Sequence, residues 1–198
     1  MNTLEDDVRR CVDFHGHLCP GLALGIVAAR AGLEELGVDR SHDEEVVSCL
    51  ETDACCADAV QVLSGSTFGK GNFIYRDVGK VAMTFISRDR ESSVRLCLKP
   101  GAIRLSDAHR ALMDKVMGRG NPTEAQHKEF WRLHNQRAEE ILRMPWSDIF
   151  SMTTVAPAIP PKAVIEPSAL CDRCGEPVMA SKLKEIDGRA LCLTCRST

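Results

Sequence analysis

The sequence predicts a domain of mixed helices and strands followed by a small domain organised by metal. Three observations support this. Helical and extended apolar patterns succeed one another through residues 1–150, four prolines then occur within residues 151–169, and two Cys-x-x-Cys pairs lie within residues 170–198. With 198 residues, the chain is long enough for one ordinary domain and a small one. We therefore expect a core domain, an extended linker and a metal-binding module over these three ranges.

Five stretches of the core domain carry helical signals. Pro20 suits the first turn of an apolar helix, and Gly37 suits the position just after its end. Thr52, Ser106 and Thr123 are typical N-caps for later helices. The predicted helices are residues 1–13, 20–36, 52–65, 106–118 and 123–144.

The strand signals lie between the third and fourth of these helices and just before the third. Residues 44–51 are predicted to form a strand. Residues 72–88 are predicted to form a β-hairpin that turns near Asp77–Lys80, and residues 92–99 to form a further strand. The core domain is therefore expected to contain both helices and strands.

Composition excludes several functional classes. The net charge is -3, which gives no electrostatic basis for binding nucleic acid or an anionic membrane surface. The apolar run over residues 20–29 is too short to cross a membrane. The N-terminal residues are polar and acidic, unlike a secretory signal. We expect a cytoplasmic protein, in which ten cysteines more often bind metal or perform chemistry than form disulfides.

The C-terminal cysteines have the spacing of a zinc site. Each Cys-x-x-Cys pair offers two thiolates from one turn, and Asp187-Gly188 is expected to turn a hairpin that brings the pairs together. Four thiolates complete a tetrahedral zinc site, although rubredoxin-like iron and disulfide pairing are alternatives. Acidic and basic side chains balance in this segment, so a structural or protein-docking role is expected rather than nucleic-acid binding. The predicted ligands are Cys171, Cys174, Cys192 and Cys195.

A second cluster of metal-capable side chains lies near the N-terminus, in the sequence FHGHLCPG. His15, His17 and Cys19 alternate as on an extended segment, where alternate side chains share a face. Cys19 precedes the predicted helix, and the helix N-terminus is expected to lower the pKa of its thiol. These residues are candidates for metal ligation, and His17 and Cys19 also for catalysis.

Cys55 and Cys56 extend this cluster. They open the third predicted helix, and because neighbouring helical side chains point in different directions, only one of them is expected to join the site. Burial as small apolar residues is the alternative for both. We include both as candidate metal ligands and Cys56 as a candidate catalytic residue.

Residues 65–72, GSTFGKGN, are similar to a phosphate-binding loop without matching its spacing. Lys70 is accordingly a weak candidate for binding an anionic cofactor, and a tight loop before a strand is the alternative.

The order of these motifs resembles the formylmethanofuran dehydrogenase FmdE family, which is named for one component of that enzyme. The resemblance is carried by FHGHLCPGLALG, by ETDACCADAVQVLSGSTFGKGNFIYRDVGKVA and by the C-terminal cysteine pairs. It implies a thioredoxin-like α+β core with a mixed sheet flanked by helices, and a C-terminal treble-clef zinc finger. It also implies a core metal site at the His15–Cys19 and Cys55–Cys56 motifs. The family commonly has a cysteine where this chain has Ser66, which predicts a weaker core site.

Three functions follow from the residues and the resemblance. The first is an accessory or catalytic component related to formylmethanofuran dehydrogenase, an oxidoreductase of one-carbon metabolism, with a His/Cys metal–thiol site. The alternatives are a non-enzymatic metal-delivery protein and an adaptor whose zinc finger docks a protein partner. We expect one structural zinc, with a second zinc or other divalent metal in the core. A homodimer is also expected, because the 20–36 helix and the Trp131 helix offer more apolar surface than a small core needs.

Overall fold

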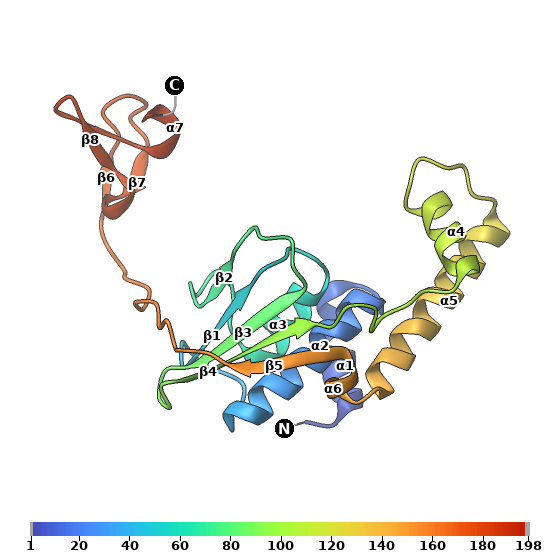
Figure 1. Ribbon diagram of the computed structural model, residues 1–198. Coiled ribbons are helices and arrows are strands. Elements are labelled where there is room, and N and C mark those ends of the chain that lie inside the picture. The colour runs from blue at the N-terminus through green and yellow to red at the C-terminus, as the bar shows by residue number, and fades with distance from the viewer. Residues whose placement is uncertain (1, 197–198) are drawn as a thin grey trace. The chain divides into compact units, whose positions relative to one another are not determined.

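The computed structural model describes residues 2–196 and divides the chain into two compact units, residues 1–162 and 163–198 (Figure 1). The first is an α+β unit with a mixed sheet flanked by helices, as the family resemblance implies. The second is a small unit built around four cysteines. Each unit is described by itself.

A five-stranded sheet forms the centre of the first unit, in the order β2-β1-β3-β4-β5. Only the β1–β2 pair is parallel, and the other neighbours are antiparallel. Residues of β1 are buried throughout, which fits its central run of apolar residues. The strands are β1 (Val46–Leu50), β2 (Phe73–Tyr75), β3 (Ala82–Ser87), β4 (Ser92–Leu98) and β5 (Phe150–Thr154).

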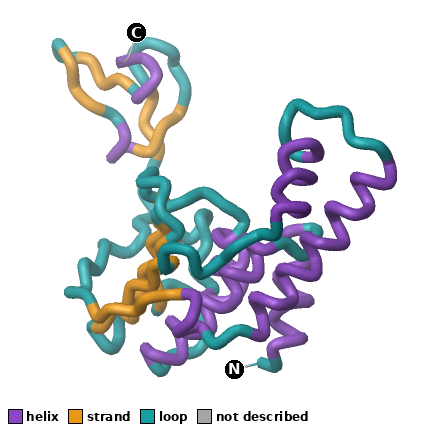
Figure 2. The backbone as a smooth tube through the Cα atoms, turned by 45° about the vertical axis from the view of Figure 1, so that its right-hand side comes forward, coloured by secondary structure: helices purple, strands orange, loops and turns teal. Residues whose placement is uncertain are grey.

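Helix α2 is central to the helical layer, in contact with α1, α3, α5 and the sheet. Figure 2 shows the helices of this unit in purple beside the strands of the sheet in orange. Its sequence is apolar on most sides, and most of its residues are buried, as expected for a helix enclosed by other elements. Small residues make this enclosure possible: a Cβ on Gly32 would lie 2.3 Å from the ring of Phe85 in β3. The helices are α1 (Leu4–His15), α2 (Pro20–Leu36), α3 (Cys56–Ser64), α4 (Asp107–Val116), α5 (Glu124–Arg143) and α6 (Trp146–Ile149).

Helices α4 and α5 pack against each other, and the distal part of α5 extends beyond the sheet (Figure 1). Their contact includes His109, Phe130 and His134, with His109 Nε2 3.1 Å from His134 Nδ1. His109 is buried and His134 is half-buried. Burial, with nearby His109 and His17, lowers the pKa of His134 to about 4. Burial, with nearby Arg137, also lowers the pKa of His109.

These histidines predict a pH-dependent stability of the α4–α5 contact. In the unfolded chain His134 gains a proton near pH 6.5, whereas in the folded chain it gains one only near pH 4. The unfolded state therefore binds more protons between these values, and stability falls as pH falls through this window. We expect thermal denaturation followed at pH 7, 6, 5 and 4 to show this loss. His134→Gln should flatten the dependence, whereas exposed His42→Gln should leave it unchanged.

Two sequence predictions about the sheet are wrong. Residues 72–88 do not form a hairpin, because β2 and β3 lie on opposite sides of β1 and the segment between them crosses the end of β1. Hydrogen bonds from Arg76 N and Lys80 N to the carbonyls of Leu50 and Glu51 hold that segment there. The predicted linker also begins too early, because residues 150–154 pair with β4 as an edge strand. Alternation alone does not reveal which strand is the partner.

The second unit consists of two small hairpins and a short helix. Asp187 and Gly188 have positive φ values of 51° and 72° and turn the β8–β9 hairpin, as the Asp-Gly sequence predicts. The elements are β6 (Ser168–Leu170), β7 (Pro177–Met179), the 3-10 turn Ala180–Lys182, β8 (Lys184–Ile186), β9 (Arg189–Leu191) and α7 (Leu193–Arg196).

Within residues 2–196, no helix combines the length and apolar character that a membrane crossing requires.

Candidate metal centres

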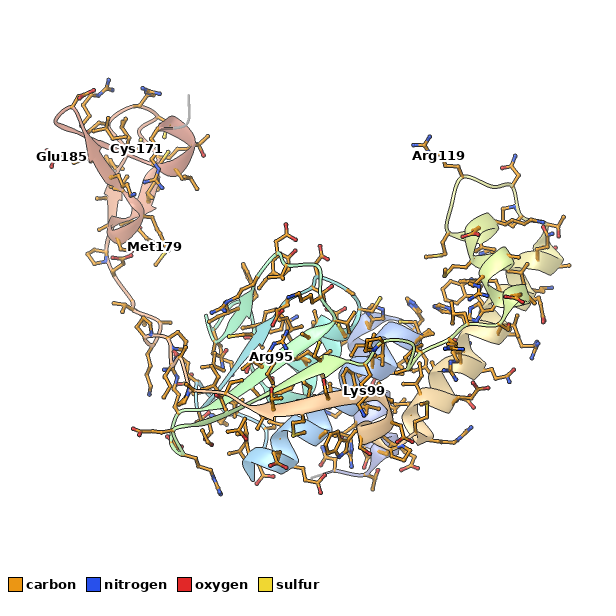
Figure 3. The ribbon with its side chains drawn as sticks, in the orientation of Figure 1. Arg95, Lys99, Arg119, Cys171, Met179 and Glu185 are labelled. Carbon is orange, nitrogen blue, oxygen red and sulfur yellow. The ribbon has the colours of Figure 1, made fainter. Side chains whose placement is uncertain are left out.

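The four C-terminal cysteines converge on one point. Their sulfur atoms all lie within 4.8 Å of one another, and a tetrahedral zinc with bonds of about 2.3 Å would place its ligands about 3.8 Å apart. Cys171 and Cys174 lie in the turn between β6 and β7, Cys192 directly precedes α7, and Cys195 lies within it. Figure 3 labels Cys171. The donor set and spacing fit a structural zinc.

Backbone amides donate hydrogen bonds to sulfur atoms of this group. Cys192 N donates to Cys171 Sγ, and Cys195 N donates to Cys192 Sγ, each at 3.4 Å. The amides of Cys174, Cys192 and Arg173 lower the pKa of Cys171 to about 6. Amide hydrogen bonds of this kind stabilise sulfur in the thiolate form that zinc requires.

A second group, formed by His15, Cys19 and Cys55, lies in the first unit. One ring nitrogen of His15 and the two sulfur atoms lie within 4.8 Å of one another. His15 ends α1, Cys19 is the N-cap of α2, and Cys55 is the N-cap of α3. Three helix ends therefore meet here and supply one imidazole and two thiols.

The carboxylate of Asp58 orients the imidazole of His15. Its Oδ2 lies 2.6 Å from His15 Nδ1, and His15 Nε2 lies 3.8 Å from Cys19 Sγ. If Nδ1 carries the proton toward Asp58, the lone pair of Nε2 points to the two sulfur atoms. A carboxylate–histidine pair of this kind typically fixes the tautomer of a metal-binding histidine.

Gly21 allows the two sulfur atoms of the core group to approach each other. A Cβ at this position would lie 3.1 Å from Cys55 Cβ and within 4 Å of the sulfur atoms of Cys55 and Cys19. One turn later, a Cβ on Gly25 would lie 2.4 Å from the backbone oxygen of Cys56. These two glycines thus set the close packing of α2 against α3 that forms the group.

The expected lowering of the Cys19 pKa is wrong. Burial raises the pKa of this thiol to about 11, although the amide of Leu22 donates to its sulfur and acts in the opposite direction. The helix N-terminus is present as predicted, but desolvation of the thiolate outweighs it.

The extended segment predicted for His15, His17 and Cys19 is also wrong. His15 is the last residue of a helix, and Gly16, with φ of 97°, reverses the chain before Cys19. Among the described residues, His17 is not part of the group within 4.8 Å. Its exposed ring lies 4.7 Å from the His15 ring and 5.2 Å from Trp131.

Other predicted site residues lie outside the core group. Cys56 is buried in α3, where burial raises its pKa to about 12. The Lys70 ammonium donates to the backbone oxygens of His42 and Asp43, so it links two loops.

Ser66 lies beyond the C-terminal end of α3, whereas Cys55 lies at its N-terminal end, and nine helical residues span about 12 Å. Its hydroxyl is buried and donates to Val46 O. The expectation that Ser66 replaces a ligand of the core metal is therefore wrong.

The sequence patterns assign no role at the site to two of its residues. Asp58 follows Cys55 by three residues, which places both on one side of a helical turn, and this spacing is the signal that could have identified it. Gly21 follows Cys19 by two residues, and nothing in the sequence identifies which element it contacts.

Comparison with known proteins shows the family of this chain. Residues 14–151 match the family model described as FmdE, Molybdenum formylmethanofuran dehydrogenase operon. The chain belongs to the FmdE family. Residues 165–198 of this FmdE-family chain match the prokaryotic dksA/traR C4-type zinc finger, which agrees with the four-cysteine group.

Two relatives extend the comparison. A probable S-adenosyl-L-methionine-binding protein of Archaeoglobus fulgidus is 31% identical over 94% of this FmdE-family chain, which spans 51% of the length of that relative. The crystal structure of a tungsten formylmethanofuran dehydrogenase FmdE-like protein from Syntrophus aciditrophicus is 23% identical. The structural alignment covers 98% of this chain and 92% of the Syntrophus chain, with a TM-score of 0.62. That similarity supports the fold.

Proposed function

We propose that this FmdE-family protein binds a catalytic divalent metal, zinc or a metal of similar preference, through His15, Cys19 and Cys55. The observation that carries the proposal is the convergence of one imidazole and two thiols, with Asp58 hydrogen-bonded to the imidazole. Three protein ligands leave a coordination position for a substrate or water, as in catalytic zinc sites with two cysteines and one histidine.

A zinc ion held there supplies Lewis-acid polarisation of a carbonyl or activation of a bound water. The protein's own residues would bind the metal and orient its ligands. Asp58 accepts a hydrogen bond from Nδ1 of His15, and Gly21 keeps Cys55 next to Cys19. The half-buried Cys55 leaves the site reachable from solvent, whereas Cys19 is buried. We infer a component related to formylmethanofuran dehydrogenase, acting on a small one-carbon carbonyl group.

Metal content tests the proposal. Protein purified anaerobically and supplied with zinc should hold two metal ions per chain, one in each group. His15→Ala should remove the core metal alone, and His42→Ala, which changes an exposed histidine in a loop, should retain both. Cobalt substitution would give a thiolate-to-cobalt charge-transfer band that loses intensity in the His15 variant. A single metal per chain in the wild type, unchanged in His15→Ala, would contradict the proposal.

Asp58→Asn should weaken core metal binding by about 10–100-fold, the usual effect of removing a hydrogen-bonding partner of a metal-binding histidine. The amide oxygen is a weaker hydrogen-bond acceptor than the carboxylate, so it fixes the tautomer and orientation of His15 less well. Competition with a fluorescent zinc chelator measures this affinity. Asp53→Asn is the matched control, because Asp53 is an exposed aspartate of the preceding loop, and unaltered affinity in Asp58→Asn would show that orientation of His15 is unimportant.

A metal-delivery protein is the second candidate, favoured by the burial that raises the pKa of Cys19 and so opposes thiolate formation in the free protein. A delivery protein should exchange its core metal with a chelator within minutes, whereas a catalytic site should retain it.

Homodimer formation remains a prediction. Its argument from α2 is wrong, since α2 is already buried within its own unit. Sedimentation at micromolar concentration tests the dimer.

A further inference from the structure

A groove lies beside the core group, between α1, α3 and the loop of residues 65–72. Its volume is about 570 Å³, within the range of small-molecule sites. We call it the Phe14–Phe68 groove. Its lining includes Arg10, Asp13, Phe14, Arg40, Gln61 and Phe68.

The two phenylalanines of this groove are exposed to solvent. The exposed fraction of Phe14 is 61% and that of Phe68 is 77%, whereas Phe85, Phe130 and Phe150 are buried. Aromatic rings left in water on the walls of one groove offer flat apolar surfaces for a ring-shaped ligand. The backbone amide of Phe68 donates to Gln61 Oε1 at 3.2 Å, which attaches the loop to α3 on the other side of the groove.

The same groove is cationic. Arg40 Nε donates to Val62 O at 2.9 Å, and Arg10 donates to the same oxygen at 3.3 Å. The Val62 carbonyl is a neutral acceptor and leaves the positive charge of Arg40 in place, and each guanidinium has further donors. Asp7 lies 3.7 Å from Arg10, so Arg40 is the stronger anion-binding group of the pair. Asp13 is the carboxylate on the lining.

The groove and the core group share two helices. Phe14 directly precedes His15 at the end of α1. On α3, Asp58 is followed three and four residues later by Gln61 and Val62, which line the groove. Residues with this spacing share one face of a helix. Asp58, the hydrogen-bond partner of His15, thus lies one helical turn from the residues of α3 that line the groove.

We propose that the Phe14–Phe68 groove binds a planar heteroaromatic molecule that carries an anionic group. The ring packs against the two phenylalanines, and the anionic group pairs with Arg40. This inference rests on the proposed function in one respect, that the bound molecule is the substrate or cosubstrate presented to the metal at His15, Cys19 and Cys55. Binding itself does not require the metal.

Flavin mononucleotide is a suitable probe, because it combines a planar ring with a phosphate and its fluorescence is quenched by aromatic stacking. Titration should give saturable quenching, with riboflavin, which lacks the phosphate, binding at least about tenfold more weakly. Adenosine monophosphate should compete, since the groove is expected to select for a planar ring and a negative charge rather than for one particular ring system. No quenching and no competition up to about 1 mM would overturn the proposal.

Matched variants locate the site. Phe68→Ala should weaken flavin mononucleotide binding by about tenfold or more, as loss of one stacking ring usually does, whereas Phe68→Tyr should retain it. Arg40→Gln should abolish the preference for flavin mononucleotide over riboflavin, and Arg40→Lys should retain part of it. Wild-type affinity in both Phe68→Ala and Arg40→Gln would show that the probe binds elsewhere and would overturn the assignment.

Two further measurements separate this inference from its rivals. Binding should persist in His15→Ala, so loss of the core metal with retained binding leaves the groove assigned while the metal proposal fails. Sedimentation of the wild type and of Phe14→Asp/Phe68→Asp tests whether a second copy of the chain covers the groove. A wild-type dimer that dissociates in this variant would overturn the ligand assignment in favour of a self-association surface.

Discussion

Cys192→Ser is expected to release one zinc per chain and to unfold residues 163–198. This small unit has only a few buried apolar residues around its cysteines, too few to offset the loss of chain entropy without a metal. Structural zinc in finger peptides contributes about 10–16 kcal/mol of apparent binding free energy at pH 7. Removal of one of four thiolates should therefore abolish folding of this unit, whereas the first unit has its own core and should remain folded.

Limited proteolysis with mass spectrometry would detect the change, as rapid cleavage after residue 162 with the first unit protected. Zinc content should fall by one equivalent. Cys97→Ser is the matched control, because Cys97 lies in β4, outside both metal groups. A Cys192 variant with full zinc content and wild-type protease resistance would show that the fold of this unit does not depend on the fourth thiolate.

Gly25→Ala is expected to destabilise the first unit by about 3 kcal/mol, a large cost for one methyl group. In an unhindered helix this change would stabilise, because alanine favours the helical conformation. Here the new Cβ would lie 2.4 Å from Cys56 O and 2.7 Å from Cys56 Cα. Backbone atoms cannot rotate away, so α3 must shift from α2.

Such a shift would also move Cys55 from Cys19, and core metal affinity should fall with stability. Urea denaturation and zinc competition measure the two effects. Gly69→Ala is a matched control, since a Cβ there meets nothing within 4 Å and should leave both quantities unchanged. Wild-type stability of Gly25→Ala would mean that the packing of α2 on α3 is looser than the structure shows.

Much of the local structure could be predicted from the sequence, because its signals are short-range. Ser106 and Thr123 cap α4 and α5, with a complete capping box at Thr123 and Gln126, and Gly37 ends α2. The C-terminal ligand set follows from cysteine spacing alone. The start of α3 could not be placed as well, because Thr52 is a good cap by type, yet the helix begins at Cys56.

The core group shows why the rest could not be predicted. The group forms only because particular helix ends meet. That meeting depends on the close packing of Gly21 and Gly25 of α2 against α3, and these two helices are distant from each other in the chain. The sequence indicates that His15 and Cys19 are close, but not that Gly16 turns His17 out of the group. Likewise, the Cys19 pKa depends on burial, a property of the assembled core that outweighs the local helix end.

The pairing of β4 with β5 bears on how this fold can vary and assemble. Leu98 lies opposite Phe150 in that pair, and Lys99 N donates to Ile149 O. Residues 99–149 therefore leave and re-enter the sheet at adjacent points, so they form an insertion between two neighbouring strands. Within it, the turn between α4 and α5, residues 117–123, can change in length without altering the strand register, at an entropic cost that rises only slowly with loop length. Helix α5 itself packs against α2. During synthesis, β5 emerges about 50 residues after β4, so the last sheet edge closes late.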